Sequence, residues 1–359
     1  MSNHFIPLTV SSVQQVTRDT LVASFSIPSA LSEQFTFTQG QHLTLRAVVD
    51  GEEIRRSYSI CSAVGEPNLR IAIKRVAGGR FSNWANDHLT SGTVVEVMPP
   101  MGRFNFPIDP NNPRRYLAFA AGSGITPVLS ILKTTLAGEP GSSFTLVYGN
   151  RATSSVIFRE ELAELKDLYA SRLSLVHVMS REPQDIDLFH GRIDAQKCKK
   201  LFEQWIDVGS HDAAFVCGPE QMMREVGDAL VDAGMAKENI KLEMFGTAPT
   251  KNGNGVAARV AVCTKECEVT IVADGSHRSF SMAMDQESVL DAALKNGIDI
   301  RYSCKGGVCA TCRCKVIDGK VEMDANYALE DYEIARGFVL SCQAFPVSDS
   351  LVLDFDLDS

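Results

Sequence analysis

The segment Cys304–Cys314 reads CKGGVCATCRC and holds four of the ten cysteines of the chain. Cys304, Cys309 and Cys312 follow the spacing C-x4-C-x2-C, and Cys342, in VLSCQAF, adds another thiol downstream. The two glycines after Lys305 give the backbone the freedom to wrap a small group. Thiols clustered in this way inside a reducing compartment indicate metal or redox chemistry rather than disulfides.

The spacing is that of a plant-type [2Fe–2S] cluster, which four thiolates hold. The alternative is zinc, whose paired ligands usually read C-x2-C on both sides. Neither the gap after Cys304 nor the lone Cys342 fits that pattern. We therefore predict Cys304, Cys309, Cys312 and Cys342 as cluster ligands and Cys314 as a buried bystander.

The length and the distribution of apolar residues indicate a multidomain protein that does not span a membrane. The chain has 359 residues, so we expect two or three domains. No apolar run approaches the ~18 residues of a membrane span, and the N-terminus MSNHFIPLTV is unlike a signal peptide. We expect a cytoplasmic protein with no membrane partner.

The net charge of −9 is concentrated at one end. Residues 261–359 hold 9 lysines and arginines against 17 aspartates and glutamates. This acidic third argues against nucleic-acid binding and suits docking to a basic protein surface. The alternative is an acidic domain whose charge serves solubility alone.

Three patterns follow one another along the chain. Residues 1–112 contain short β segments between turns, which predicts an antiparallel β-barrel. Residues 113–246 alternate apolar strands with helices, which predicts an α/β domain with a parallel sheet. Residues 247–259 are small and polar and form the predicted linker, and residues 260–359 are again rich in β structure.

The barrel region carries two candidate binding motifs. In RRSYSI, Arg56 can pair with a phosphate, Tyr58 can stack on a flat ring, and Ser59 can reach a ring nitrogen. In GGRFSNW, we expect a helix that starts at Ser82 and binds a pyrophosphate at its first N–H groups. Each motif alone has a plain structural alternative, a sheet face or a helix cap.

The α/β region carries a glycine turn. AGSGITP contains Gly122, Gly124 and Thr126 and permits close approach of a ligand to the backbone, although it is not the G-x-G-x-x-G fingerprint. Arg151 follows in YGNR, and Arg181 lies in the segment SRE. The position of Arg181 resembles the place where many ferredoxin–NADP reductases bind the 2′-phosphate of NADPH, and this resemblance favours NADPH over NADH. The alternative is a surface arginine at the end of a strand.

The order of these motifs resembles the ferredoxin–NADP reductase superfamily. The resemblance implies that Arg56, Tyr58, Ser59 and Ser82 contact FAD. It also implies NAD(P)H contacts, with Cys217 of CGP and the Glu243–Phe245 pair of LEMF near the nicotinamide. Ser59, Cys217 and Glu243 are then the candidate catalytic residues. The full set of candidate nucleotide residues is Gly122, Gly124, Thr126, Arg151, Arg181 and Phe245.

The C-terminal region resembles a β-grasp ferredoxin domain, and the domain order is that of oxygenase reductases. Several stretches, among them LFHGRID and GFVLSCQA, resemble the reductase subunits of phenylacetyl-CoA 1,2-epoxidases in phenylacetate catabolism. The resemblance implies an electron-transfer enzyme that passes electrons from NAD(P)H through FAD and the cluster to a separate diiron oxygenase. The alternatives are the reductase of a Rieske-type or other aromatic or steroid oxygenase and, more distantly, a redox-sensing regulator.

Overall fold

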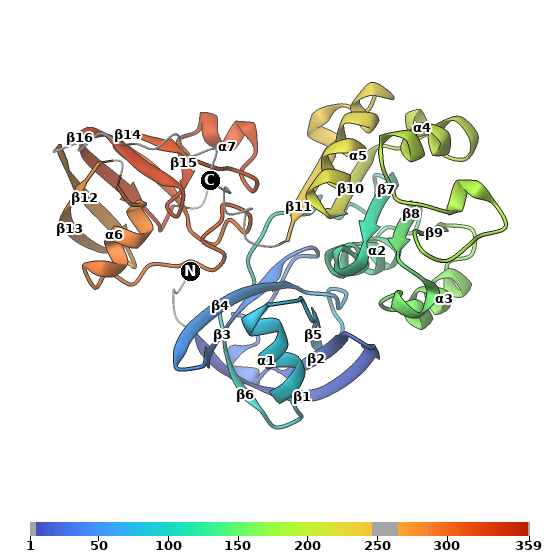
Figure 1. The fold of residues 1–359 in the computed structure, drawn as a ribbon, viewed down its shortest axis with the longest axis horizontal. Coiled ribbons are helices and arrows are strands. Elements are labelled where there is room, and N and C mark those ends of the chain that lie inside the picture. The colour runs from blue at the N-terminus through green and yellow to red at the C-terminus, as the bar shows by residue number, and fades with distance from the viewer. Residues whose placement is uncertain (1–4, 246–264, 285, 358–359) are drawn as a thin grey trace. The chain divides into compact units, whose positions relative to one another are not determined.

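A computed structural model describes residues 5–245, 265–284 and 286–357. The chain forms two compact units, of which one is Ile6–Phe245 and the other contains the described residues from 265 onward. The predicted linker, 247–259, lies outside the described residues. Three separate sheets make up the fold (Figure 1), two in the first unit and one in the second.

The first sheet is antiparallel, with the strand order β4-β3-β6-β1-β2-β5. An isolated bridge from Ile60 to Ile71 joins the end of β4 to β5 and brings the two edge strands together. The helix α1 (Arg80–His88) packs against β3, β4 and β5. The strands are β1 (Ile6–Thr17), β2 (Thr20–Ser26), β3 (His42–Val49), β4 (Glu52–Ser59), β5 (Leu69–Lys74) and β6 (Val94–Val97).

The second sheet is parallel, with the order β11-β10-β7-β8-β9. Its strands bury both faces, because neighbouring residues point to opposite sides. Along β7, Tyr116 and Ala118 join one core cluster, and Leu117 and Phe119 join another. The strands are β7 (Arg115–Ala121), β8 (Ser143–Asn150), β9 (Leu173–Met179), β10 (Ala213–Gly218) and β11 (Ile240–Met244). The helices are α2 (Ile125–Gly138), α3 (Arg159–Leu168), α4 (Ala195–Gln204) and α5 (Glu220–Asp232).

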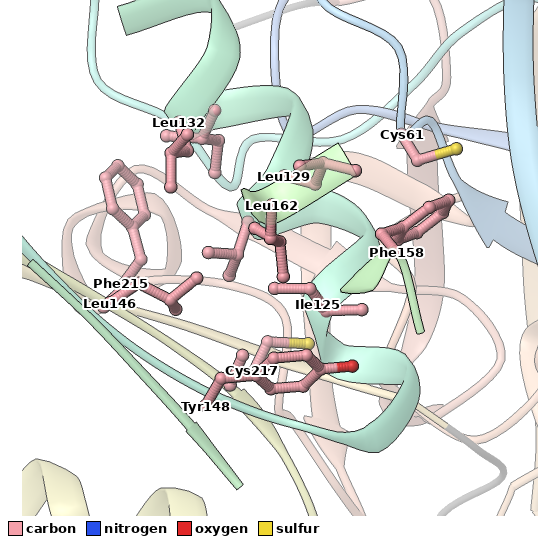
Figure 2. Packing of buried hydrophobic residues seen from close by; sticks show 14 of the residues in the cluster. Cys61, Ile125, Leu129, Leu132, Leu146, Tyr148, Phe158, Leu162, Phe215 and Cys217 are labelled. Atoms are coloured by element: carbon pink, nitrogen blue, oxygen red, sulfur yellow. The ribbon is translucent and has the colours of Figure 1, made fainter. Parts of the chain in front are cut away.

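One core runs through both sheets of the first unit. Cys61 and Ala72, which belong to the barrel region, lie in the same buried cluster as Ile125 and Leu129 of α2. Figure 2 shows part of this cluster, including Cys61 and Cys217. The barrel and the parallel sheet therefore share buried apolar surface, which holds them together as a single packed body.

The third sheet has the order β13-β12-β16-β14-β15, in which β12 and β16 run parallel and the other pairs antiparallel. Its strands are β12 (Glu266–Ala273), β13 (Ser276–Ala283), β14 (Arg313–Met323), β15 (Phe338–Leu340) and β16 (Ala344–Asp354). The helices α6 (Val289–Lys295) and α7 (Asp331–Ala335) accompany it. The predicted fold class, an antiparallel barrel, a parallel α/β sheet and a small C-terminal β domain, is confirmed.

Candidate functional site

The carboxyl ends of the parallel strands form the first candidate site. From the central strand β7 the chain passes to β8 on one side and later to β10 on the other. At such a switch point the loops diverge and leave a crevice, where ligands bind in open α/β sheets. The glycine turn Gly122–Gly124 follows β7 at this point, and Cys217 lies at the end of β10.

Close packing at the switch point requires glycine. A side-chain carbon built on Gly124 would lie 2.1 Å from the carbonyl oxygen of Cys217, so no larger residue fits. Gly122 has a φ of +54°, in the left-handed region that favours glycine. Thr126 is buried and closes the turn by donating from Oγ1 to the carbonyl of Ser123 at 3.0 Å.

Arg151 and Arg181 lie at the same edge, after β8 and β9 respectively. Their backbones are joined, because the N–H of Arg181 donates to the carbonyl of Arg151 at 2.8 Å. Both residues are exposed. Glu182 accepts from the N–H and the hydroxyl of Thr153 at 2.7 and 2.6 Å, and these bonds lower its pKa. These bonds tie the loop after β9 to the loop after β8, so two exposed arginines lie at the same edge of the sheet.

Ser59 and Glu243 meet across the two sheets of the first unit. The hydroxyl of Ser59, at the end of β4, donates to Oε2 of Glu243 on β11 at 3.1 Å. Burial of the carboxyl raises the pKa of Glu243 to about 8, although the bond from Ser59 opposes the rise. The side chain therefore holds a proton near neutral pH, at a position that both sheets share.

Cys217 is the neighbour of Glu243 in the register of β10 and β11. It is fully buried, and this burial raises the pKa of its thiol well above the ordinary value, with a smaller contribution from Glu243 once that carboxyl is ionised at high pH. Cys217 is therefore a protonated, neutral thiol at neutral pH. Phe245 follows β11 and is 39% exposed. Three sequence-predicted residues, Ser59, Cys217 and Glu243, come together in the folded chain.

A second group of predicted residues lies along β4 and α1. Burial raises the pKa of Tyr58, and its ring centroid lies 5.7 Å from that of Phe81 in the first turn of α1. Arg56 is partly exposed and donates to the carbonyl of Arg55 at 2.7 Å. The Tyr58 ring thus lies beside the first turn of α1 and near the charge of Arg56, an arrangement that suits a flavin dinucleotide.

The predicted helix start at Ser82 is wrong. The helix begins at Arg80, with Gly79 as its N-cap. Ser82 lies inside the first turn, where its buried hydroxyl accepts from the N–H of Val76 at 3.2 Å and donates to the carbonyl of Gly79 at 3.3 Å. The serine fixes the glycine-containing loop before α1 instead of capping the helix.

Lys74 was missed by the sequence reasoning. It ends β5 in the barrel, yet a side-chain carbon built on Gly122 would lie 3.8 Å from its Nζ. Its ammonium also lies 3.8 Å from a carboxylate oxygen of Asp19. The sequence signal was weak, because a lysine at a strand end usually faces solvent. Here it places a positive charge beside the glycine turn, where a nucleotide phosphate would be recognised.

The four predicted cluster ligands come together in the second unit. Their thiols interact in pairs: Cys304 with Cys309 and Cys342, and Cys342 with Cys312. Cys304 accepts from the N–H of Gly306 at 3.3 Å, and the pKa of its thiol is lowered by bonds from these neighbours. Backbone N–H groups that point at sulfur and four convergent thiols are a donor set that fits a [2Fe–2S] cluster.

Glycine is also required in the ligand loop. Gly307 has a φ of +74°, and a side-chain carbon there would lie 2.9 Å from the carbonyl oxygen of Ala325. Cys314 lies outside the ligand group in its contacts: it is buried on β14, and its sulfur lies 3.9 Å from the carbonyl oxygen of Val339.

Family models match all three regions. The "Oxidoreductase FAD-binding domain" matches residues 7–106, the "Oxidoreductase NAD-binding domain" residues 119–228, and the "2Fe-2S iron-sulfur cluster binding domain" residues 271–347. The chain is 48% identical over 352 residues to one of the subunits of the 1,2-phenylacetyl-CoA epoxidase of Escherichia coli, and the match covers 98% of both chains. It is 36% identical over 359 residues to the ferredoxin reductase component of 3-ketosteroid-9-alpha-monooxygenase from Rhodococcus rhodochrous, covering 97% of this chain and 96% of the relative.

The chain therefore belongs to the family of reductase components of monooxygenases that these two relatives represent. Among solved structures, phthalate dioxygenase reductase is 26% identical, with a TM-score of 0.58 and 98% of both chains covered. An intact type IV self-sufficient cytochrome P450 monooxygenase shares the fold at a TM-score of 0.70 and 22% identity. There our reductase covers 41% of the longer chain.

This reductase is therefore an oxidoreductase that uses FAD, a pyridine nucleotide and a [2Fe–2S] cluster. Bound FAD supplies the conversion of an electron pair from the nucleotide into single electrons for the cluster. Among the residues that the structure describes, no helix is both long enough and apolar enough to cross a bilayer.

Proposed function

We propose that this chain is the reductase component of a phenylacetyl-CoA epoxidase, and that it delivers electrons from NAD(P)H to a separate diiron oxygenase. The observation that carries the proposal is the identity of 48% to the Escherichia coli epoxidase component over nearly the whole of both chains. The role in phenylacetate catabolism comes from that relative. The cytoplasm is the proposed location, because NAD(P)H and reduced cysteines belong to a reducing compartment.

A second candidate is the reductase of a steroid or other multicomponent oxygenase. The 36% identity to the 3-ketosteroid-9-alpha-monooxygenase component favours it, since the match spans nearly the whole of both chains. A redox-sensing regulator is disfavoured, because a sensor has no need of a nucleotide site coupled to a flavin site.

We further propose roles for the site residues. Arg56, Tyr58, Ser59 and Ser82 bind FAD, with Tyr58 against the flavin ring. Ser59 and Glu243 form a hydrogen-bonded pair beside the flavin ring, so two protons are available there, that of the Ser59 hydroxyl and that of the neutral Glu243 carboxyl. Buried Cys217 lies beside Glu243 and keeps a neutral thiol next to this pair.

At the nucleotide site, the backbone of the glycine turn receives the pyrophosphate. Arg181 is proposed to pair with a 2′-phosphate, which favours NADPH. The nucleotide residues are Gly122, Gly124, Thr126, Arg151, Arg181 and Phe245, and the cluster ligands are Cys304, Cys309, Cys312 and Cys342. We keep 1–112, 113–246, 247–259 and 260–359 as the proposed FAD domain, nucleotide domain, linker and ferredoxin domain.

Reconstitution tests this function. The purified holoprotein is mixed with the oxygenase of a phenylacetyl-CoA epoxidase or with that of a steroid 9α-hydroxylase, and product formed per NAD(P)H consumed is measured. We expect coupled turnover with the first and little with the second. A holoprotein with full flavin and iron that cannot reduce cytochrome c or ferricyanide with NADPH would overturn the reductase assignment itself.

A further inference from the structure

Two chain segments carry the cluster ligands. Three sulfurs belong to the loop 304–312, between α6 and β14, and the fourth belongs to Cys342, in the turn between β15 and β16. A cluster can bind to both segments only if the loop 304–312 and Cys342 are held at the right distance from each other. The backbone supplies one tie, because the N–H of Ser341 donates to the carbonyl of Cys312 at 3.1 Å.

The side chain of Gln343 supplies a second tie. Its amide nitrogen lies 3.1 Å from the carbonyl oxygen of Lys305, 2.9 Å from that of Cys342 and 3.8 Å from the sulfur of Cys342. A side-chain carbon built on Gly307 would lie 3.2 Å from Cγ of Gln343, so the aliphatic stem rests on the ligand loop. One side chain therefore contacts both ligand-bearing segments.

The backbone of Gln343 is fixed as well. Its N–H donates to the carbonyl of Leu340 at 2.8 Å, and its carbonyl accepts from the N–H of Asp324 at 3.0 Å. The amide group has two N–H donors and faces three acceptors, all of them on or next to the ligand segments. The backbone bonds of Gln343 therefore hold its side-chain amide, an N–H donor, at the edge of the cluster site.

A donor near a ligand sulfur has an electrostatic consequence. A bound cluster would gain one negative charge on one-electron reduction, and the ligand sulfurs would carry part of that charge. Hydrogen bonds to those sulfurs stabilise that charge and raise the reduction potential. The same side chain that spaces the two segments also favours the reduced state.

We propose that Gln343 is a positioning residue that ties the loop 304–312 to Cys342 and raises the reduction potential of the cluster. The inference rests on the [2Fe–2S] site and is independent of which oxygenase receives the electrons. Its test therefore needs no oxygenase, so its failure and the failure of the proposed function can be told apart.

The test compares Gln343→Met with the parent holoprotein. Methionine has a similar length but no donor. We expect Gln343→Met to keep its flavin and to bind a cluster whose reduction potential, from an EPR-monitored titration, is lower. The expected change is about tenfold in the equilibrium constant for reduction, which is about 59 mV for one electron. We also expect the cluster absorbance to be lost several-fold faster in the presence of a chelator.

Two more variants sharpen the result. Gln343→Glu keeps the shape and replaces the donor by a carboxylate, so its potential should fall below that of Gln343→Met. Gln221→Met makes the same change at a glutamine of α5 that donates to Glu225 at 2.8 Å, and it should match the parent. A potential in Gln343→Met and Gln343→Glu equal to that of the parent would overturn the proposal, whatever the rate of cluster loss. Failure of both variants to bind any cluster, with Gln221→Met fully loaded, would support the positioning role.

Discussion

At the scale of single residues, the contact between Ser59 and Glu243 joins positions 184 apart in the chain. The sequence motifs named both residues, but spacing alone could not bring them to 3.1 Å. Their meeting depends on how the barrel packs against the parallel sheet, a long-range property. Lys74 was missed for the same reason. The cysteine ligands were predictable, because their local spacing carries the chemistry.

Glu243 should make stability depend on pH. Burial raises its pKa from an ordinary 4.5 to about 8. Between these values the folded chain binds one proton more than the unfolded chain, so stability falls as the pH rises through this window. In urea denaturation of the FAD-loaded protein, we expect the parent to lose about 4 kcal/mol relative to Glu243→Gln between roughly pH 5 and 9. If the free energy of unfolding depends on pH in the same way in both proteins, the raised pKa of Glu243 is refuted.

Cys342→Ser and Cys314→Ser form a matched pair of substitutions. Cys342 is a predicted ligand, whereas the sulfur of Cys314 lies near the Val339 carbonyl. We expect Cys342→Ser to lose most of its iron–sulfur absorbance while NADPH still reduces the flavin. Cys314→Ser should keep that absorbance. Loss of the cluster in Cys314→Ser would show that the ligand assignment is wrong.

Arg181→Ala tests the choice of nucleotide. The exposed guanidinium lies after β9, at the edge where the nucleotide is proposed to bind. We expect the KM for NADPH to rise about tenfold, the equivalent of about 1.4 kcal/mol, and the KM for NADH to change little. Arg115→Ala is the control, since this exposed arginine begins β7 at the opposite end of the sheet. Equal effects of Arg181→Ala on both nucleotides would exclude a 2′-phosphate contact.

At the scale of elements, the strands of the parallel sheet were predictable because both faces are buried and the runs are continuously apolar. The register that brings Cys217 beside Glu243 was not, because it depends on pairing between strands. The start of α1 was misplaced by two residues. Serine is a common N-cap, but here Gly79 takes that position and Ser82 bonds to the preceding loop.

Four charged side chains join β5, α2 and α3 in an alternating network. Oε1 of Glu161 accepts from Arg70 at 2.7 Å and from Lys133 at 2.6 Å. Glu66 contacts the same two cations. All four side chains are at most 27% exposed, so solvent screens them only partly. Glu66 and Arg70 belong to the barrel region, whereas Lys133 and Glu161 belong to the parallel-sheet region.

Glu161→Gln should weaken the joint between the two sheets. It leaves two largely buried cations with one carboxylate, and we expect the free energy of unfolding to fall by about 1–3 kcal/mol. Asp87→Asn is the control, because the Arg75–Asp87 pair is more exposed, at 38% and 53%, and solvent screens its attraction, so its loss should lower stability less. Urea denaturation of both variants measures the difference. Equal losses would mean that the network adds nothing beyond an ordinary surface pair.

At the scale of the whole molecule, the three-part organisation was predictable because each part has its own periodicity and motif. The core that joins the barrel to the parallel sheet was not, because it depends on long-range contacts that no local pattern encodes. The uneven charge is a property of the sequence itself: residues 261–359 carry 17 acidic against 9 basic side chains. This negative charge should speed the association of the reductase with an electron acceptor whose docking surface is basic.

Electron delivery to the oxygenase should weaken as salt is added, because an acidic surface that attracts a basic partner is screened over about 8–10 Å at physiological ionic strength. Between roughly 50 and 300 mM salt we expect the second-order rate of oxygenase reduction to fall about tenfold. Reduction of the cluster by saturating NAD(P)H within the same protein should change little. Stopped-flow absorbance measures both steps.

Asp324→Asn tests whether the attraction for the oxygenase comes from the surface beside the cluster. Asp324 is exposed and begins the segment that covers the ligand loop, where the N–H of Tyr327 donates to the carbonyl of Gly307 at 3.0 Å. An electron acceptor must approach this side of the domain closely, so removal of the charge should slow oxygenase reduction at low salt and flatten its salt dependence. Glu268→Gln removes an equal charge from an exposed position on β12 and should have a smaller effect. If the two variants slow the reaction equally, the attraction comes from the net charge of the domain and not from the surface beside the cluster.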